Sequence, residues 1–128
     1  MTRERAVRAV VQRFGNHPFQ YGSFDCCELV RQTHYFLRGK DPAPHLQYED
    51  ELGANIIIDA HGGLSGLMTT LFGESVSVEA TETADPVRVV IPGFGDIMGI
   101  RVPNGVLVPL QAGLNKVPLK YALEGWRI

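Results

Sequence analysis

Two adjacent thiols, Cys26 and Cys27, are the residues of this sequence best suited to nucleophilic chemistry. Asp25 comes directly before them, and an amphipathic segment follows as far as about Leu37. Asp is a favoured helix N-cap, so this pattern predicts a helix whose first turn contains Cys26. Free backbone N–H groups and the helix dipole favour a thiolate at that position. Cys26 is therefore a candidate nucleophile.

A structural role is the main alternative for Cys26, because most free cysteines are small buried hydrophobes. A disulfide between adjacent cysteines is geometrically unfavourable. The two cysteines and the scattered histidines have neither the Cys-x-x-Cys nor the His-x-x-x-His spacing of a zinc site. Gly93, Gly95 and Gly99 do not open a helix after a strand, which argues against a nucleotide-binding loop. We therefore expect no metal and no cofactor.

Helices are predicted to position these thiols in the first 72 residues. Thr2 is a plausible N-cap for a helix that ends near Phe14. Two more helices are expected at residues 49–61 and 64–72, the first of them stopped by two glycines. The expected buried stripe of the first helix is Ala6, Val7, Val10, Val11 and Phe14, and that of the Cys26 helix is Cys26, Leu29, Val30, Thr33 and Leu37.

The pattern changes to short strands after residue 75. Val76, Val78 and Ala80 alternate with polar residues, and apolar runs bounded by Pro and Gly follow at residues 87–91, 97–102 and 106–110. The apolar residues Val106, Leu107, Val108 and Leu110 of the last run look exposed. A partner surface is one way to cover them, and an ordinary small sheet that packs on the helices is the alternative. Helices followed by a small, antiparallel sheet predict an α+β fold.

Length and composition limit the possible classes of protein. The 128 residues predict one domain, residues 1–128, and 45% hydrophobic residues predict a folded core. A formal net charge of −2 makes nucleic acid and anionic membranes poor partners. No window approaches the length of a membrane span. The charged start, with Arg3, Glu4 and Arg5, does not resemble a signal peptide.

Residues 18–26, Pro-Phe-Gln-Tyr-Gly-Ser-Phe-Asp-Cys, resemble the aromatic-x-x-x-Asp-Cys entry to the nucleophile helix of NlpC-type cysteine peptidases, the papain-like family that cuts peptidoglycan stems. The chain as a whole resembles a small NlpC-like branch common in phage and prophage tail modules. Four further stretches carry this resemblance, at residues 39–43, 48–63, 92–97 and 122–128. The resemblance implies a papain-like fold and makes Cys26 the nucleophile position.

The base that such enzymes need is missing from its expected place. The resemblance implies a histidine on a strand after the turn at Gly95 and Asp96, but all four histidines precede residue 62. His34 lies on the same helix as Cys26, about 12 Å away at 1.5 Å per residue, which is beyond hydrogen-bond reach. The sources of a base that stay open are His17, His45, His61 and another chain.

Three functions are compatible with these residues. The first is a phage or prophage tail-tip (baseplate hub) protein with a degenerate, inactive NlpC-like fold, which binds other tail proteins in the virion and is made in the bacterial cytoplasm. The second is an active peptidoglycan endopeptidase or amidase that uses Cys26 on stem peptides. The third is a thiol-reactive enzyme or redox sensor that uses Cys26 with Cys27. The missing histidine favours the first.

Overall fold

The computed structural model describes all residues from 1 to 128. Four α-helices come first in the chain, and a sheet of five strands follows, which confirms the predicted α+β class. The helices are α1 (Arg3–Phe14), α2 (Cys26–Arg38), α3 (Glu51–Ala60) and α4 (Gly63–Phe72). The strands are β1 (Pro86–Ile91), β2 (Gly95–Val102), β3 (Gly105–Leu110), β4 (Gly113–Val117) and β5 (Ala122–Gly125).

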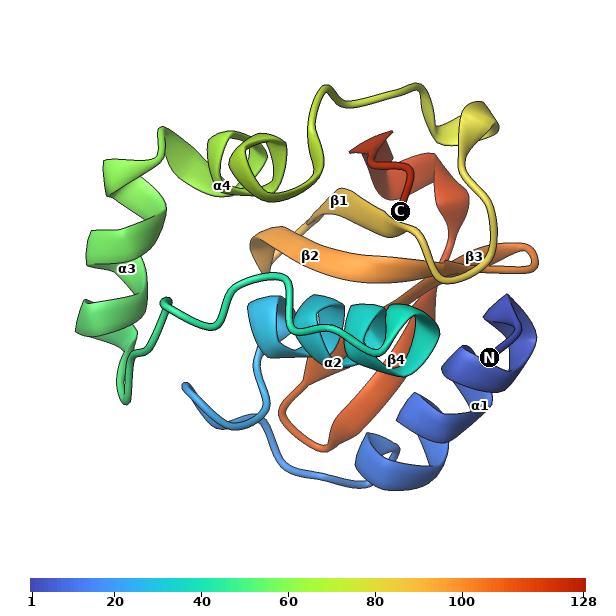
Figure 1. Cartoon of the computed structure of the whole chain (residues 1–128), viewed down its shortest axis with the longest axis horizontal. Helices are drawn as coiled ribbons and strands as arrows, with labels where there is room; N and C mark the ends of the chain where they lie inside the picture. The colour runs from blue at the N-terminus through green and yellow to red at the C-terminus, as the bar shows by residue number, and fades with distance from the viewer.

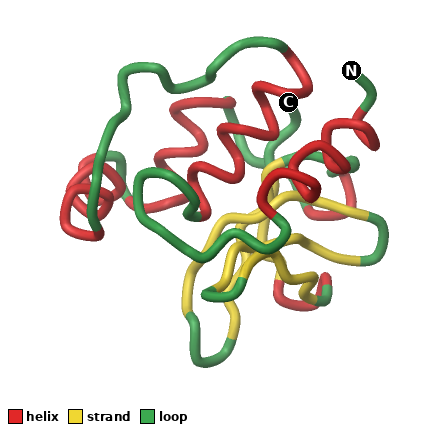
Figure 2. Tube along the Cα trace, turned by 90° about the horizontal axis from the view of Figure 1, so that it is seen from below, coloured by secondary structure: helices red, strands yellow, loops and turns green.

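The sheet is antiparallel throughout, with the strand order β4-β3-β2-β1-β5. The four long helices lie mainly to one side of it (Figure 2). α2 crosses the sheet and packs on β2 and β3, while α3 lies at the edge of the molecule beyond α4 (Figure 1). The sheet therefore supports α2, the helix that carries both thiols.

Two hydrophobic clusters cover the two faces of the sheet. The larger cluster joins the helices to β2 and includes Trp126, whose side chain is fully buried. The smaller cluster lies under η2 (Leu119–Tyr121), a short 3₁₀ helix, and contains Val87, Val89, Ile91, Val106 and Val108. Alternate residues of β3 thus serve opposite faces, as the pleat of a strand requires.

The apolar residues of β3 are covered within the chain and do not form an exposed surface. Val106 and Val108 are fully buried in the smaller cluster, so the expected exposure at residues 106–110 is wrong. Val11 of α1 departs from expectation in the other sense, since 43% of it is exposed. The helix turns that position toward solvent while Ala6, Val10 and Phe14 form the buried face.

Residues 76–80 do not form the predicted strand. Val76 makes a single bridge to Gly125, and η1 (Val78–Ala80), another 3₁₀ helix, follows it. The N–H groups of Ala80 and Thr81 bond back to Ser77 and Val78, so they are not free to pair with a strand. The sequence did not predict β4 and β5. The five residues of β4 include Asn and Lys, the four residues of β5 include Glu, and neither strand has an apolar alternation.

Candidate active site

Cys26 is the first residue of α2, as predicted, and its side chain is half-buried. Asp25 precedes it in an extended conformation, and its Oδ1 accepts a hydrogen bond from the backbone N–H of Glu28 at 2.9 Å. This is the N-cap that the sequence predicted. The cap leaves Cys26 in the first turn of α2, at the positive end of the helix dipole.

The carboxylate of Asp25 holds three parts of the chain together. Besides the N–H of Glu28, it accepts the N–H of Gly22 on Oδ2 at 2.8 Å and the hydroxyl of Tyr48 at 2.7 Å from each oxygen. Asp25 is only 2% exposed, so these donors replace the water that a carboxylate would otherwise bind. The loop before α2, the start of α2 and the segment before α3 are therefore fixed relative to Cys26.

Cys26 lies in a pocket of about 400 Å³. The loop before α2 contributes Phe19 and Tyr21 to this pocket, and α3 contributes Ala54, Asn55 and Ile58. The opposite wall comes from the sheet and its turns, with Phe94, Asp96, Ile97, Pro109, Leu110 and Gln111. The pocket is large enough for a few amino-acid residues, and its wall is mostly apolar.

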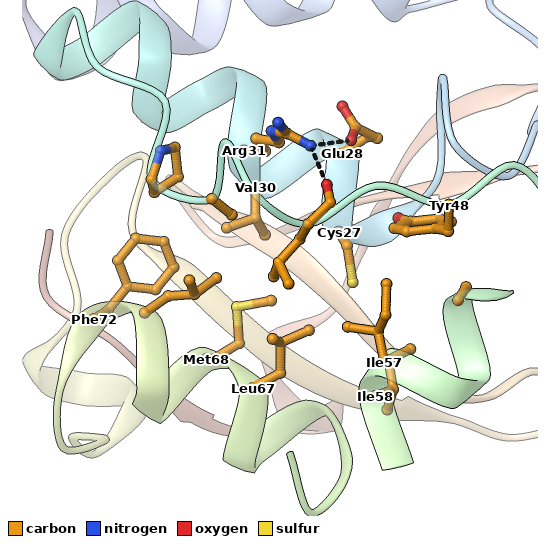
Figure 3. Close-up of a pocket in the computed structure, with 15 residues that line it drawn as sticks. Cys27, Glu28, Val30, Arg31, Tyr48, Ile57, Ile58, Leu67, Met68 and Phe72 are labelled. Atoms are coloured by element: carbon orange, nitrogen blue, oxygen red, sulfur yellow. Dashed lines mark hydrogen bonds and ion pairs between the residues drawn. The ribbon is translucent and has the colours of Figure 1, made fainter. Parts of the chain in front are cut away.

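Cys27 lies between this pocket and a second, smaller cavity of about 30 Å³. Figure 3 shows its side chain directed from α2 toward residues of α3 and α4, among them Ile57 and Leu67. A hydrogen bond to the Cys26 thiol and burial raise the pKa of Cys27 well above its ordinary value. Cys27 therefore stays a neutral thiol at pH 7, while Cys26 faces the larger pocket.

Arg31 fixes the segment that carries Tyr48. Its guanidinium binds both carboxylate oxygens of Asp41, at 2.8 and 2.6 Å. It also contacts Glu28, as Figure 3 shows, and the carbonyl oxygen of Leu46. The hydrogen bond from Arg31 lowers the pKa of Asp41, whereas burial raises that of Glu28. Residues 41–48 are thus clamped against α2, and Tyr48 reaches Asp25.

None of the four histidines lines the pocket that contains Cys26. Nδ1 of His17 contacts the carbonyl oxygen of Pro18, that of His34 the carbonyl of Lys40, and that of His61 the carbonyl of Ile57. His45 is exposed in the loop before α3. The strands from which the resemblance implied a base present Ile97, Pro109 and Leu110 to the pocket instead.

Tyr48 is the site residue that sequence reasoning missed as a functional side chain. It lies 23 residues after Asp25, outside any helix, and no periodicity or motif marks it as a partner of the cap.

No group of three or more His, Cys, Asp or Glu side chains is arranged to hold a metal ion. None of the helices has the length and apolar character needed to cross a membrane.

The model of a family described as a domain of unknown function, DUF6950, matches residues 1–128. The chain belongs to this family. Among solved structures, the fold is similar to the crystal structure of the NlpC/p60 domain of the peptidoglycan hydrolase SagA, with a TM-score of 0.65, 14% identity and full coverage of both chains. A comparison with curated proteins finds no match.

This likeness establishes an NlpC/p60-like fold for the DUF6950 chain, as the sequence motifs implied. The geometry then limits what the site can do. A thiol at a helix N-terminus, open to a pocket, can react with an electrophile. The pocket offers no imidazole to take its proton or to protonate a leaving amine, so the usual Cys-His pair is not assembled within this chain.

Proposed function

We propose that this DUF6950 protein is a structural component of a phage or prophage tail, at the tail tip or baseplate hub, which keeps an NlpC/p60-like fold without peptidase activity. One observation carries the proposal: the pocket around Cys26 is lined by carboxylates, aromatic rings and apolar side chains, and by no histidine. The sequence motifs shared with the tail-module branch support the location.

The remaining polar groups of the pocket are poor substitutes for a histidine. Burial and the nearby negative charge of Glu51 raise the pKa of Tyr21, so its phenol stays protonated at neutral pH. Asp25 is occupied by three donors, and Asp96 forms an ion pair with Arg88 at 3.1 Å. General acid–base help is worth about 10²–10⁴-fold in rate, and its loss would leave little cleavage.

A tail component would be synthesised in the bacterial cytoplasm and incorporated into the virion, with other tail or baseplate proteins as its partners. The pocket would then serve as a binding site, and peptidoglycan peptides are a ligand class consistent with the fold's likeness to a peptidoglycan hydrolase domain. Mass spectrometry of tail particles from cells that carry the gene is expected to detect the protein. Particles that lack it would contradict this location.

An active endopeptidase or amidase is the second candidate, because Cys26 faces an open pocket of about 400 Å³ at a helix N-terminus. It requires a base from a neighbouring chain. The deciding experiment incubates the protein with peptidoglycan stem peptides and intact cell walls, beside a Cys26→Ala control. We expect no released fragments from either protein. Turnover that disappears in the control would establish the peptidase and overturn the inactive assignment.

A further inference from the structure

Charge is unevenly distributed along this chain. Residues 41–87 contain nine Asp and Glu residues and no Lys or Arg, so all the Lys and Arg residues lie before or after that segment. α1 belongs to the basic part of the chain and α3 to the acidic part. Figure 1, drawn with the longest axis horizontal, shows these two helices at opposite ends of the molecule. The protein is therefore electrically polar, although its formal net charge is only −2.

The outer face of α1 is basic. Arg5 and Arg8 are three residues apart, so they are neighbours on the helix surface, and both are exposed. Val11, which is 43% exposed, and Gln12 continue this side of the helix. Neither arginine forms an ion pair with a carboxylate of the chain, not even with Glu4 on the same helix. The α1 face, residues 5, 8, 11 and 12, thus offers two guanidinium groups to an anionic partner.

The outer face of α3 is acidic and apolar. Leu52 and Ile56 lie one turn apart and are 70% and 60% exposed. Glu51 and Asp59 flank them on the same helix, and both carboxylates are exposed and form no ion pair. Large apolar side chains that adjoin on one exposed face, with charges at their rim, mark an interaction surface. We call residues 51, 52, 56 and 59 the α3 face.

We propose that a second copy of this chain covers these surfaces, with the α1 face of one copy docked on the α3 face of the next. The guanidinium groups of α1 pair with the carboxylates of α3, and Val11 packs on the apolar side chains between them. The two helices also match in length, since their 12 and 10 residues span about 18 and 15 Å at 1.5 Å per residue.

The place of the two faces decides the type of assembly. They are different surfaces at opposite ends of the molecule, so the contact is heterologous, and successive copies build a ring or an open filament. Two single helices bury less than the roughly 800 Å² per partner of a standard interface, which predicts weak association with a Kd of about 10⁻⁴ M. The inference rests neither on the tail location nor on the Cys26 pocket.

Sedimentation velocity of the purified chain measures this association. At concentrations up to about 300 µM in low salt, we expect species heavier than the 14.1 kDa monomer. The association constant should fall at least about fivefold in 0.5 M salt, because salt screens exposed charges. Wild-type protein that stays monomeric throughout would overturn the inference. So would monomeric protein whose binding to a polyanion such as heparin is lost on charge reversal of Arg5 and Arg8, since the α1 face would then serve another partner.

Charge reversal on each face tests the pairing itself. Arg5→Glu with Arg8→Glu, and separately Glu51→Lys with Asp59→Lys, should each abolish self-association. An equimolar mixture of these two proteins should associate again, because each then carries the faces that complement the other. A mixture that stays monomeric would refute the pairing of α1 with α3.

Two further variants complete the test. Leu52→Ser with Ile56→Ser leaves every charge in place and should still weaken association, because the apolar contact is lost. Glu74→Lys with Glu79→Lys changes the net charge as much as the α3 reversal does, but at exposed positions outside both faces. This control should associate like the wild type. Equal loss in the control and in the α3 reversal would mean that net charge alone governs association, which would overturn the inference.

Discussion

The hydroxyl of Tyr48 donates to both carboxylate oxygens of Asp25, at 2.7 Å from each. This bifurcated contact joins the residue that caps α2 to the segment that leads into α3. Asp25 is buried, so the phenol supplies solvation that water does not. The same contact places the Tyr48 ring between the two cavities that flank Cys27, where it lines both.

Removing the Tyr48 hydroxyl should therefore destabilise the fold. Tyr48→Phe leaves a buried carboxylate short of one donor, and we expect it to lower the free energy of unfolding by about 1–3 kcal/mol. Urea denaturation measures the change. Tyr35→Phe, whose hydroxyl is on a side chain that is 52% exposed, is the matched control and should have little effect. Equal stability of the two variants would mean that the Tyr48 contact contributes nothing net.

Gly22 should resist substitution more strongly than Gly39, although both have a left-handed backbone. Their φ angles are 85° and 74°, a region that is unfavourable by about 1–2 kcal/mol for other residues. A Cβ on Gly22 would also collide with the carbonyl oxygen of Tyr48, whereas one on Gly39 would meet nothing within 4 Å. Gly22→Ala should thus lose clearly more stability than Gly39→Ala in thermal denaturation. A smaller loss at Gly22 would show that the Tyr48 segment moves freely.

The stability contributed by Glu28 should depend on pH in the unusual direction for a carboxylate. Burial raises its pKa above the unfolded value, with Arg31 as a partial counterweight, so ionisation of this side chain opposes folding. The neutral Glu28 side chain contributes to the free energy of unfolding below about pH 4, and this contribution is lost as the pH rises through the pKa of Glu28 in the folded protein.

Glu28→Gln should accordingly be at least as stable as the parent protein at pH 7, with the difference shrinking toward pH 4. Denaturant unfolding at several pH values measures this, and Glu74→Gln, at an exposed position, is the control. If Glu28→Gln proves less stable at pH 7 by more than about 1 kcal/mol, the ion pair with Arg31 outweighs the burial of the charge.

The two thiols should differ in reactivity. Cys26 faces the large pocket at the helix N-terminus, while the hydrogen bond to Cys26 and burial raise the pKa of Cys27. Because the thiolate is the reacting species, iodoacetamide at pH 8 should modify Cys26 at least about tenfold faster than Cys27. Peptide mapping by mass spectrometry separates the two sites, with Cys26→Ala as the reference for Cys27 alone. Similar rates would show that Cys27 is accessible.

Local patterns predicted the helical half of this fold well. Thr2 and Asp25 act as the caps expected for α1 and α2, and the helix predicted from residue 49 begins after the cap Asp50. These signals are local, so the sequence carries them directly. The contact between Tyr48 and Asp25 depends instead on how Arg31 clamps a distant loop, and no spacing rule encodes it.

The strands and the pocket were harder to predict for a related reason. β4 and β5 are held by pairing with β3 and β1, not by a strong apolar pattern of their own. The aromatic and acidic lining of the pocket comes from the loop before α2, the segment before α3, the turn after β1 and the start of β2, which meet only in three dimensions. Cys26 was found in advance because its cap and its helix are contiguous in the sequence.

The attachment of α3 has a consequence for how the pocket responds to a ligand. Only Ala54 of its ten residues is buried, and α3 packs mainly on α4. One wall of the pocket is therefore borne by a weakly anchored helix, while the other wall belongs to the sheet. Amide hydrogens of α3 should exchange with solvent faster than those of α2, because local opening there breaks few contacts. A ligand that bridges the two walls would slow that exchange, so protection of the α3 amides becomes a measure of how far the pocket is occupied.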